Sequence, residues 1–354
     1  LTYPASTQER GHLLSGPIVA GRDGSVWVFG PEEYYRLGDP RTMRWDRLGP
    51  WYADAPVPGE SRDAEAGQVA RPTALTDIEV GQDGTVWYPL GFGAYPFYDG
   101  EPEHGLWSYD GDRWEPRGPG GAVTQVELSS DGSVWALWAD DPFGDSGELS
   151  VRRLEDGRWE PAGETVAPLA YDDRMYWDGL YVSDAGEAWL TAGDVRRLEA
   201  GEWRPVPPPS VPDFADFDVG PDGTPWSAFQ VSSGNPGSDL LARFEDGEWT
   251  SWGQDTMPES GNARWQVPHR VGPDGSIWIG LKGHLECGGI GRFDGRTWQT
   301  FLPGTCVYSF DIDPDGRAWI HGGAIRWNAL GDDLLSVRPI ETYVVDPGAA
   351  GGEG

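Results

Sequence analysis

The chain is poor in several residue types, and each shortage narrows what it can do. Its 354 residues include two cysteines, three methionines and a single lysine, Lys282. No run of about 18 apolar residues occurs, and no charged segment followed by an apolar one opens the sequence. We therefore expect no membrane insertion by this chain itself. Because it begins with Leu1, we also expect that a preceding segment has been removed, one that could have tethered it.

The shortage of basic residues leaves a large negative charge. There are 58 acidic and 26 basic side chains, which gives a net charge of −32. Such a chain repels phosphate backbones and anionic lipids, so no nucleic-acid partner is expected. Two interpretations of the acidity stay open, namely solubility or adaptation to salt, and attraction of a cationic ligand.

The two cysteines, Cys287 and Cys306, are predicted to form a disulfide. The bridge would close a loop of about 19 residues and contribute about 3 kcal/mol to stability. A pair of free buried thiols is the alternative. Because disulfides persist in oxidising compartments, the pair predicts an extracytoplasmic location, either extracellular or at the cell surface.

The abundant residues are glycine, proline and tryptophan, with 52, 31 and 20 copies. Many belong to one repeated phrase, an apolar stretch followed by Asp-Gly, two further residues and Trp. Asp-Gly between two apolar runs predicts a tight hairpin, since Gly adopts the positive φ that the turn requires. The fourth copy has Ala185-Gly186 in place of Asp-Gly and keeps the glycine. The seven copies end at Trp27, Trp87, Trp135, Trp189, Trp226, Trp278 and Trp319.

A second signal follows each phrase: an apolar strand, another tight turn, and a second Trp often followed by Pro, as in Tyr109 to Pro116. Two hairpins per unit make four strands, and the proline fits an outer edge strand because it cannot donate to a ladder. This pattern predicts an all-β fold, a seven-bladed β-propeller with four antiparallel strands per blade. The blades are expected at approximately 12–50, 72–118, 122–163, 178–206, 214–254, 266–303 and 307–341.

The blades are predicted to form one propeller over residues 1–346, followed by a flexible tail at 347–354. A tryptophan at the same strand position of every unit can wedge between adjacent blades, which an array of β-sandwiches would not explain. The last unit is expected to supply its own outer strand from residues 335–340. Residues 1–6 would then remain as an added clasp.

The repeat also resembles known propellers. Asp274 to Gly280, followed by Gly291 to Trp298, resembles the propeller repeats of two-component regulator sensors. It is more distantly similar to the propellers of streptogramin (virginiamycin B) lyases. In the sensor group such propellers are extracytoplasmic modules that perceive a ligand or a partner, so the resemblance implies a sensing domain.

The connections between hairpins are long, whereas the hairpin turns are short. In an antiparallel blade all the long connections leave from one end, which we call the long-loop face. Long loops on a rigid scaffold commonly carry binding residues. These loops contain aromatics that the repeat does not require, beside acids such as Asp54, Asp99 and Asp172. The alternative is that the aromatics only pin the loops down as small satellite cores. The predicted ligand-binding residues are Trp51, Tyr52, Phe92, Tyr95, Tyr98, Tyr171, Tyr176, Trp177, Phe214 and Trp265.

A metal-dependent lyase or hydrolase on the same face is the alternative function. Streptogramin lyases use a His and Glu site with a divalent metal, and here the residues would be His269, His284, Glu286 and His321. However, the aromatic-Thr-Glu sequence that this family places after the second-strand Trp is absent at 279–281 and 320–322. Residues 311–316 mimic the start of a calcium loop, but Gly322 stands where such a loop requires Glu. No metal and no other cofactor is therefore expected.

Binding or sensing through the long-loop face is the function that the sequence favours. Aromatic faces beside carboxylates suit a sugar, a cationic group or a peptide, so the partner is expected to be a small molecule, a glycan or a protein. A structural module for surface assembly is a third interpretation. The sequence leans against an enzyme without deciding the point.

Overall fold

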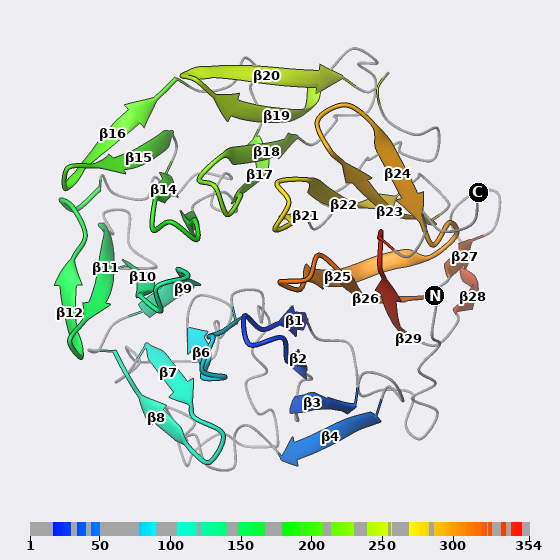
Figure 1. Cartoon of the computed structure of the whole chain (residues 1–354), viewed down its shortest axis with the longest axis horizontal. Coiled ribbons are helices and arrows are strands. Elements are labelled where there is room, and N and C mark those ends of the chain that lie inside the picture. Colours follow the sequence, from blue (N-terminus) through cyan, green and yellow to red (C-terminus); the bar gives the residue numbers. More distant parts are fainter. Residues whose placement is uncertain are drawn as a thin grey trace. The chain divides into compact units, whose positions relative to one another are not determined.

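The chain folds as a seven-bladed β-propeller, as the sequence predicts (Figure 1). The computed structural model describes residues 17–29, 34–39, 44–49, 78–89, 105–118, 122–139, 148–166, 179–192, 194–207, 214–229, 239–253, 256, 269–282, 287–323, 325–327, 334–337 and 341–348. Within these ranges, no helix is both long and apolar enough to cross a membrane.

The chain divides into two compact units. The first unit is Gly21–Arg36 with Asp46–Pro207, and the second is Leu1–Ala20 and Leu37–Trp45 with Pro208–Gly354. One four-stranded sheet lies nearest the N-terminus in the sequence. Its strands are β1 (Ile18–Ala20), β2 (Val26–Phe29), β3 (Tyr34–Asp39) and β4 (Arg44–Gly49).

The first unit holds three more sheets, each a meander of consecutive antiparallel strands. The first of these contains β5 (Glu79–Val80), β6 (Val86–Pro89), β7 (Leu106–Tyr109) and β8 (Trp114–Pro116). The next contains β9 (Ala122–Leu128), β10 (Val134–Ala139), β11 (Leu149–Glu155) and β12 (Arg158–Pro161). The third contains β13 (Gly179–Val182), β14 (Ala188–Thr191), β15 (Val195–Glu199) and β16 (Glu202–Val206).

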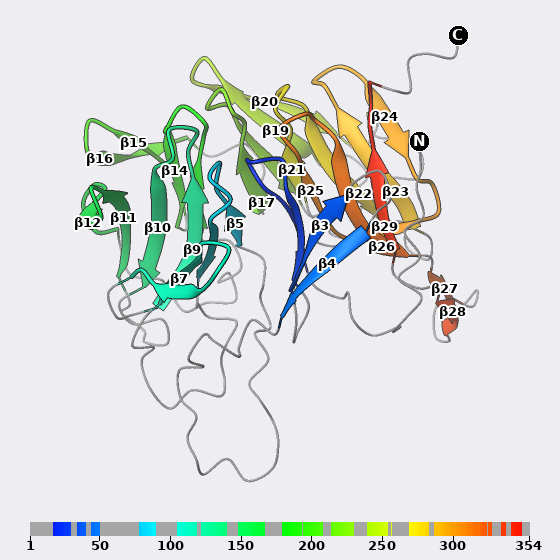
Figure 2. The same ribbon diagram turned by 60° about the horizontal axis from the view of Figure 1, so that its bottom comes forward.

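The second unit holds the remaining three sheets, two of them with four strands (Figure 2). One contains β17 (Phe214–Val219), β18 (Pro225–Phe229), β19 (Asp239–Glu245) and β20 (Glu248–Gly253). The next contains β21 (His269–Val271), β22 (Ile277–Lys282), β23 (Cys287–Phe293) and β24 (Trp298–Phe301). The last contains β25 (Cys306–Ile312), β26 (Ala318–Gly323) and β29 (Glu341–Val345), and β27 (Ile325–Trp327) pairs with β28 (Leu334–Val337) in a separate hairpin.

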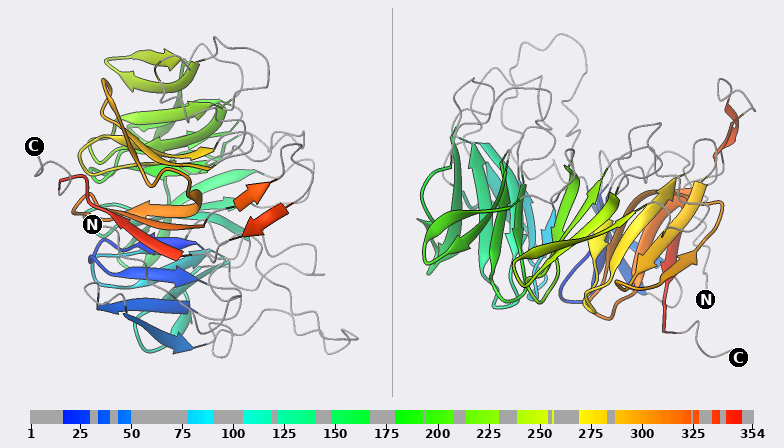
Figure 3. Two further views of the ribbon diagram at one scale, coloured as in Figure 1. Left: turned by 90° about the vertical axis from the view of Figure 1, so that its right-hand side faces the viewer. Right: turned by 90° about the horizontal axis from the view of Figure 1, so that it is seen from above.

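The prediction that residues 335–340 form the outer strand of the last blade was wrong. Instead, β29 pairs with β26, from Ala318 opposite Val345 to Gly322 opposite Glu341. In Figure 3 the red strand β29 lies apart from the orange-red hairpin of β27 and β28. Within the predicted segment, residues up to 337 belong to β28, which pairs with β27 and not with this sheet. Val345 belongs to the apolar core of this sheet, which favours β29 as the packed strand. The proposed clasp, residues 1–6, lies outside the described residues.

Hydrogen bonds to the aspartates explain the repeated Asp-Gly turns. The Oδ1 atom of Asp83 accepts the N–H of Thr85 at 3.0 Å, and that of Asp274 accepts the N–H of Ser276 at 3.1 Å. Such Asx turns favour aspartate, and the next residue must be glycine because its φ is positive, as in Gly84 at +79°. In the fourth copy, which lacks the aspartate, the Ser183 hydroxyl accepts the N–H of Glu187 instead.

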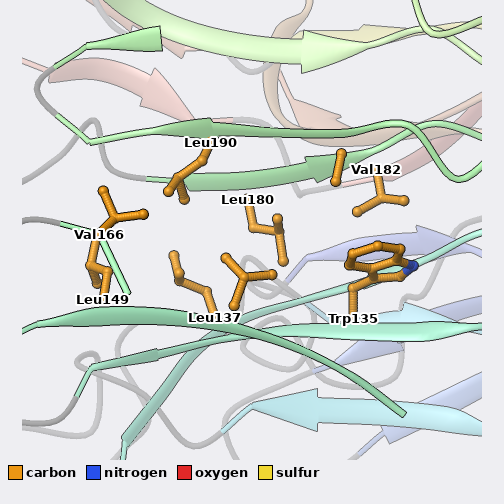
Figure 4. Packing of buried hydrophobic residues seen from close by; sticks show 9 residues of the cluster. Trp135, Leu137, Leu149, Val166, Leu180, Val182 and Leu190 are labelled. Carbon is orange, nitrogen blue, oxygen red and sulfur yellow. The ribbon is translucent and has the colours of Figure 1, made fainter. Parts of the chain in front are cut away.

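Each repeat tryptophan is buried, with at most 8% of its surface exposed. Trp135 of β10 packs with Leu180 of β13, and Trp226 of β18 packs with Ile277 of β22. Figure 4 shows Trp135 and Leu137 facing Leu180, Val182 and Leu190 of the following sheet. The tryptophan therefore fills the space between successive sheets, as predicted.

An arginine on the third strand lies over the repeat tryptophan in five sheets. The distance from the guanidinium carbon to the ring centre is between 5.1 and 6.0 Å. Each of these arginines also forms an ion pair with an acidic side chain, as Arg153 does with Asp131. Cation–π contact and ion pairing hold the arginine in place, so these positive charges are neutralised within the fold. The five are Arg36, Arg153, Arg197, Arg243 and Arg292.

Candidate functional site

One position in the first strand of each sheet is often occupied by a charged residue. It lies eight residues before the repeat tryptophan and pairs with it across the ladder, as Asp218 does with Trp226 and Asp311 with Trp319. The residues that flank Asp218, Phe217 and Val219, are buried and apolar. Five of the seven copies carry a charge at this position, in strands that are otherwise largely apolar. The seven residues are Val19, Glu79, Glu127, Tyr181, Asp218, Arg270 and Asp311.

In the second unit three residues at this position, Asp218, Arg270 and Asp311, form a cluster with the adjacent His269, which we call the Arg270 cluster. The residues come from β17, β21 and β25, the first strands of three successive sheets. The Nε atom of Arg270 lies 3.6 Å from Oδ1 of Asp311. The positive charge of Arg270 also attracts the carboxylate of Asp218, so one guanidinium interacts with two carboxylates.

The two carboxylates of the cluster bind backbone N–H groups of neighbouring sheets. Asp218 accepts the N–H of Val271 at 2.7 Å, and Asp311 accepts the N–H of Ala20 at 2.8 Å. A first strand is an edge strand, whose outward N–H groups need a partner. Asp218 therefore joins β17 to β21. Asp311 joins β25 to β1, the contact between the last and the first sheet, and the Ser309 hydroxyl supports it by accepting the N–H of Ile18 at 3.1 Å.

Burial shifts the titration of both carboxyls in the same direction. It raises the pKa of Asp218, while the positive charge of Arg270 and the proximity of His269 limit that rise. Burial also raises the pKa of Asp311; Arg270 opposes this rise, and the charge of Asp218 adds to it. The positive charge of Arg270 therefore favours the ionised form of both carboxyls.

The first unit has its own charged group around Arg22. Arg22 forms an ion pair with Asp184 and donates to the carbonyl of Leu128. Burial disfavours its charge, but the nearby acids Glu79, Asp184 and Glu127 outweigh burial and raise the pKa of Arg22. The edge strand β13 is covered in this unit as well, because Gln125 Oε1 accepts the N–H of Leu180 at 2.7 Å.

Contacts between sheets account for these charged residues. Among the described residues, no group of three or more His, Cys, Asp or Glu side chains could hold a metal ion. The calcium-like string is also structural, since Asp313 accepts the N–H of Arg317 at 2.9 Å and the indole N–H of Trp319 at 2.9 Å. These contacts within the turn account for Asp313, and Asp315 is the aspartate of the repeated Asp-Gly phrase.

Two histidines of the alternative catalytic set lie inside the sheets. His269 of β21 has no exposed surface and pairs with Ile279 across the ladder. Phe217 and Phe310 occupy the equivalent position in the neighbouring sheets, which makes it a core position. His321 of β26 is 1% exposed and pairs with Ser309 and Thr342. His284 and Glu286 lie outside the described residues.

The predicted aromatic binding residues fall on segments that the structure does not describe. The exception is Phe214, whose backbone belongs to β17 and pairs with Phe229, although its side chain is not described. The group as a whole therefore stays a prediction. The residues outside the described ranges are Trp51, Tyr52, Phe92, Tyr95, Tyr98, Tyr171, Tyr176, Trp177 and Trp265.

The predicted disulfide is present. It joins Cys287, the first residue of β23, to Cys306, the first residue of β25, with their Cα atoms 4.5 Å apart. The bridge thus links the last two sheets at the end where their first strands begin, which is the long-loop face. Two residues beyond it stands Tyr308, an exposed aromatic that the sequence analysis did not single out.

Comparison with known proteins supports the fold and leaves the family open. No protein-family model matches the chain. The immune protein Tsi7 of Pseudomonas aeruginosa is 32% identical over 144 residues, which are 38% of this chain and 42% of that protein. The match thus spans less than half of that relative's length.

Two solved structures agree with the fold over nearly the whole chain. A virginiamycin B lyase from Staphylococcus aureus has a TM-score of 0.56 at 12% identity and covers 98% of this chain and 99% of its own. A structure of YCF48 bound to D1 peptide has a TM-score of 0.52 at 13% identity and covers 98% and 95%. The expected resemblance to lyase propellers is thus confirmed at the level of fold.

Proposed function

We propose that this chain is an extracytoplasmic binding protein whose long-loop face holds a positively charged protein or peptide. The observation that carries the proposal is the charge balance of −32. Such a charge attracts cationic partners over several ångströms and speeds their encounter. A protein partner presents many positive charges at once, which suits so large a surplus better than a small neutral ligand does.

The arrangement of the basic residues supports this proposal. The arginines that stack on repeat tryptophans are paired with acids inside their own blades, as Arg197 is with Glu187 at 2.8 Å and Arg153 with Asp131 at 3.1 Å. Arg317 is likewise held by Asp313 and Asp315. In the part of the chain that the structure describes, acids therefore offset the charge of these arginines, which weakens their repulsion of an approaching cation.

Location and fold add two further lines of support. The Cys287–Cys306 bridge favours an oxidising, extracytoplasmic compartment. The YCF48 propeller, whose fold this chain shares, was solved with a peptide bound, so a propeller of this kind can hold a peptide. Each sheet is also stiffened by its turns and tryptophans, which leaves the connections at the long-loop face to provide specificity.

A panel of short peptides graded in net charge tests the proposal. Each basic peptide is paired with a control in which Glu replaces Lys and Arg while the aromatic content is unchanged. We expect the full chain to bind a subset of basic peptides with one-to-one stoichiometry in calorimetric titrations at about 0.15 M salt. The affinity should fall as salt is raised, because screening weakens charge attraction. Equal binding of basic peptides and their acidic controls, or no binding of either, would overturn the proposal.

A further inference from the structure

Tyr308 is an exposed aromatic on a strand whose other residues are buried or half-buried. It retains 42% of its surface, while Cys306 and Phe310 on either side are buried. In the described part of the chain, only one other large apolar side chain is as open, Leu48 at 39% on the fourth strand β4. An exposed tyrosine at a binding face is a typical anchor, because it offers a large ring with few rotatable bonds.

A β-bulge turns Tyr308 out of the ladder. In the pairing of β25 with β26, Val307 lies opposite Gly322 and Ser309 opposite His321, so Tyr308 has no opposite residue. The first strands β9 and β17 have the same irregularity, with Thr124 and Ala215 as the extra residues. All three lie eleven residues before the repeat tryptophan. Bulges at this kind of rim re-aim side chains, often beside functional sites.

The repeat itself does not require an aromatic at this position. The residues eleven before the tryptophan in the other units include no aromatic, so Tyr308 is not one more copy of a structural side chain. These residues are Gly16, Thr76, Thr124, Asp178, Ala215 and Val267. Packing inside the blade therefore does not explain the choice of tyrosine.

The segment before Tyr308 is held rigidly. We call residues 302–305, the turn between β24 and β25, the strap. The N–H of Gly304 donates to Cys287 at 3.0 Å, and Thr305 accepts the N–H of Gly289 at 3.0 Å. The Cys287–Cys306 disulfide fixes the end of the strap. On the other side Gly322 approaches so closely that a Cβ there would lie 2.6 Å from the Cys306 carbonyl oxygen.

We propose that Tyr308 is a ligand-contacting residue at which a guanidinium or ammonium side chain of a basic protein partner stacks on the phenol ring. The inference rests on the proposed function and adds a residue to it. A rigid, outward-turned ring next to the long-loop face of an acidic chain attracts a cation both through the ring face and through the surrounding charge. The bulge, the strap and the bridge hold the ring in position before the partner arrives, which lowers the entropy cost of binding.

An oligoarginine peptide, titrated into the full chain by calorimetry, tests this inference. Tyr308→Ala should weaken binding by between about 2-fold and 30-fold, the range that cation–π contacts span. Tyr308→Phe, which keeps the ring face, should stay within about 2-fold of the unchanged chain. Leu48→Ala removes a comparably exposed apolar side chain elsewhere and should not change the affinity.

The outcomes separate the two proposals. If the unchanged chain binds oligoarginine and Tyr308→Ala binds it equally well, the role of Tyr308 is refuted and the proposed function stands. If the unchanged chain does not bind, the proposed function fails and the stacking role fails with it. A thermal unfolding curve of Tyr308→Ala that matches the unchanged chain shows that any loss of binding is not a loss of fold. If Tyr308→Ala is unstable, loss of affinity in Tyr308→Phe would overturn the stacking role.

Discussion

Replacement of Gly289 by alanine is the sharpest test of how the strap is held. Gly289 has a φ of +86°, and a Cβ at this position would come closer than 3.0 Å to the carbonyl oxygens of Phe301 and Leu302. Both are backbone atoms of the segment that crosses to β25, so no side-chain rotation relieves the overlap. The strap must move away from β23.

The expected cost has two parts. The left-handed backbone costs an alanine about 1–2 kcal/mol. Displacement of the strap weakens the bonds of Gly304 to Cys287 and of Gly289 to Thr305, each worth about 1 kcal/mol. We therefore expect Gly289→Ala to lower the free energy of unfolding by about 3–4 kcal/mol, a large share of the 5–15 kcal/mol typical of a domain.

Gly275→Ala is the matched control. Gly275 has a similar φ of +77°, but a Cβ there would meet nothing within 4 Å, so only the backbone term of about 1–2 kcal/mol applies. Urea unfolding of both variants, followed by tryptophan fluorescence, measures the difference. If the two variants lose equal stability, the close approach of the strap to Gly289 is refuted.

Three further perturbations test other parts of the structure. Replacement of both Cys287 and Cys306 by serine should lower the free energy of unfolding by about 3 kcal/mol, since the bridge closes a loop of 19 residues; a loss below about 1 kcal/mol in denaturant titrations would contradict this. Asp311→Ala removes the acceptor of the Ala20 N–H, so hydrogen exchange at Ala20 should be faster than in Asp311→Asn, which keeps an acceptor oxygen. Equal rates at Ala20 would refute the role of Asp311 in joining the last sheet to the first. Hydrogen bonds from the Ser129 and Ser133 hydroxyls and the Ser133 N–H lower the pKa of Asp131 to about 2. Because this pKa is below the unfolded value, the ionised Asp131 stabilises the fold above about pH 4 and loses that effect as the pH falls to about 2. The stability difference between the unchanged chain and Asp131→Asn should shrink over that range, and a difference that is constant with pH would count against it.

The fold was predictable because its signals are local and repeated. Asp83-Gly84 and its copies require the same positive φ, and Trp87 and its copies fill the same space between sheets. The outer strand of the last blade was not predictable in the same way. Its segment carries no second Trp, and only the packing of Val345 shows which residues complete the sheet.

The candidate site was less predictable because its residues depend on contacts between sheets. The charges at Asp218, Arg270 and Asp311 could have been found by aligning the seven copies at the position eight residues before each tryptophan. Their role could not, since the N–H groups that they cover belong to other sheets. Tyr308 was missed because a bulge, not the strand alternation, turns it outward. The repeat therefore predicts the turns and tryptophans that all blades share, but not the role of a residue such as Tyr308 that occurs in one blade only.

Hydrogen exchange of the full chain with and without a bound basic peptide tests the central claim most directly. The proposed function predicts slower exchange at strand ends of the long-loop face and unchanged exchange in the Asp-Gly turns such as 272–276 at the opposite end of the sheets. The role of Tyr308 predicts that the slowed amides include the start of β25. Protection confined to the Asp-Gly turns, or no peptide-dependent protection at all, would contradict binding of a cationic partner at the long-loop face.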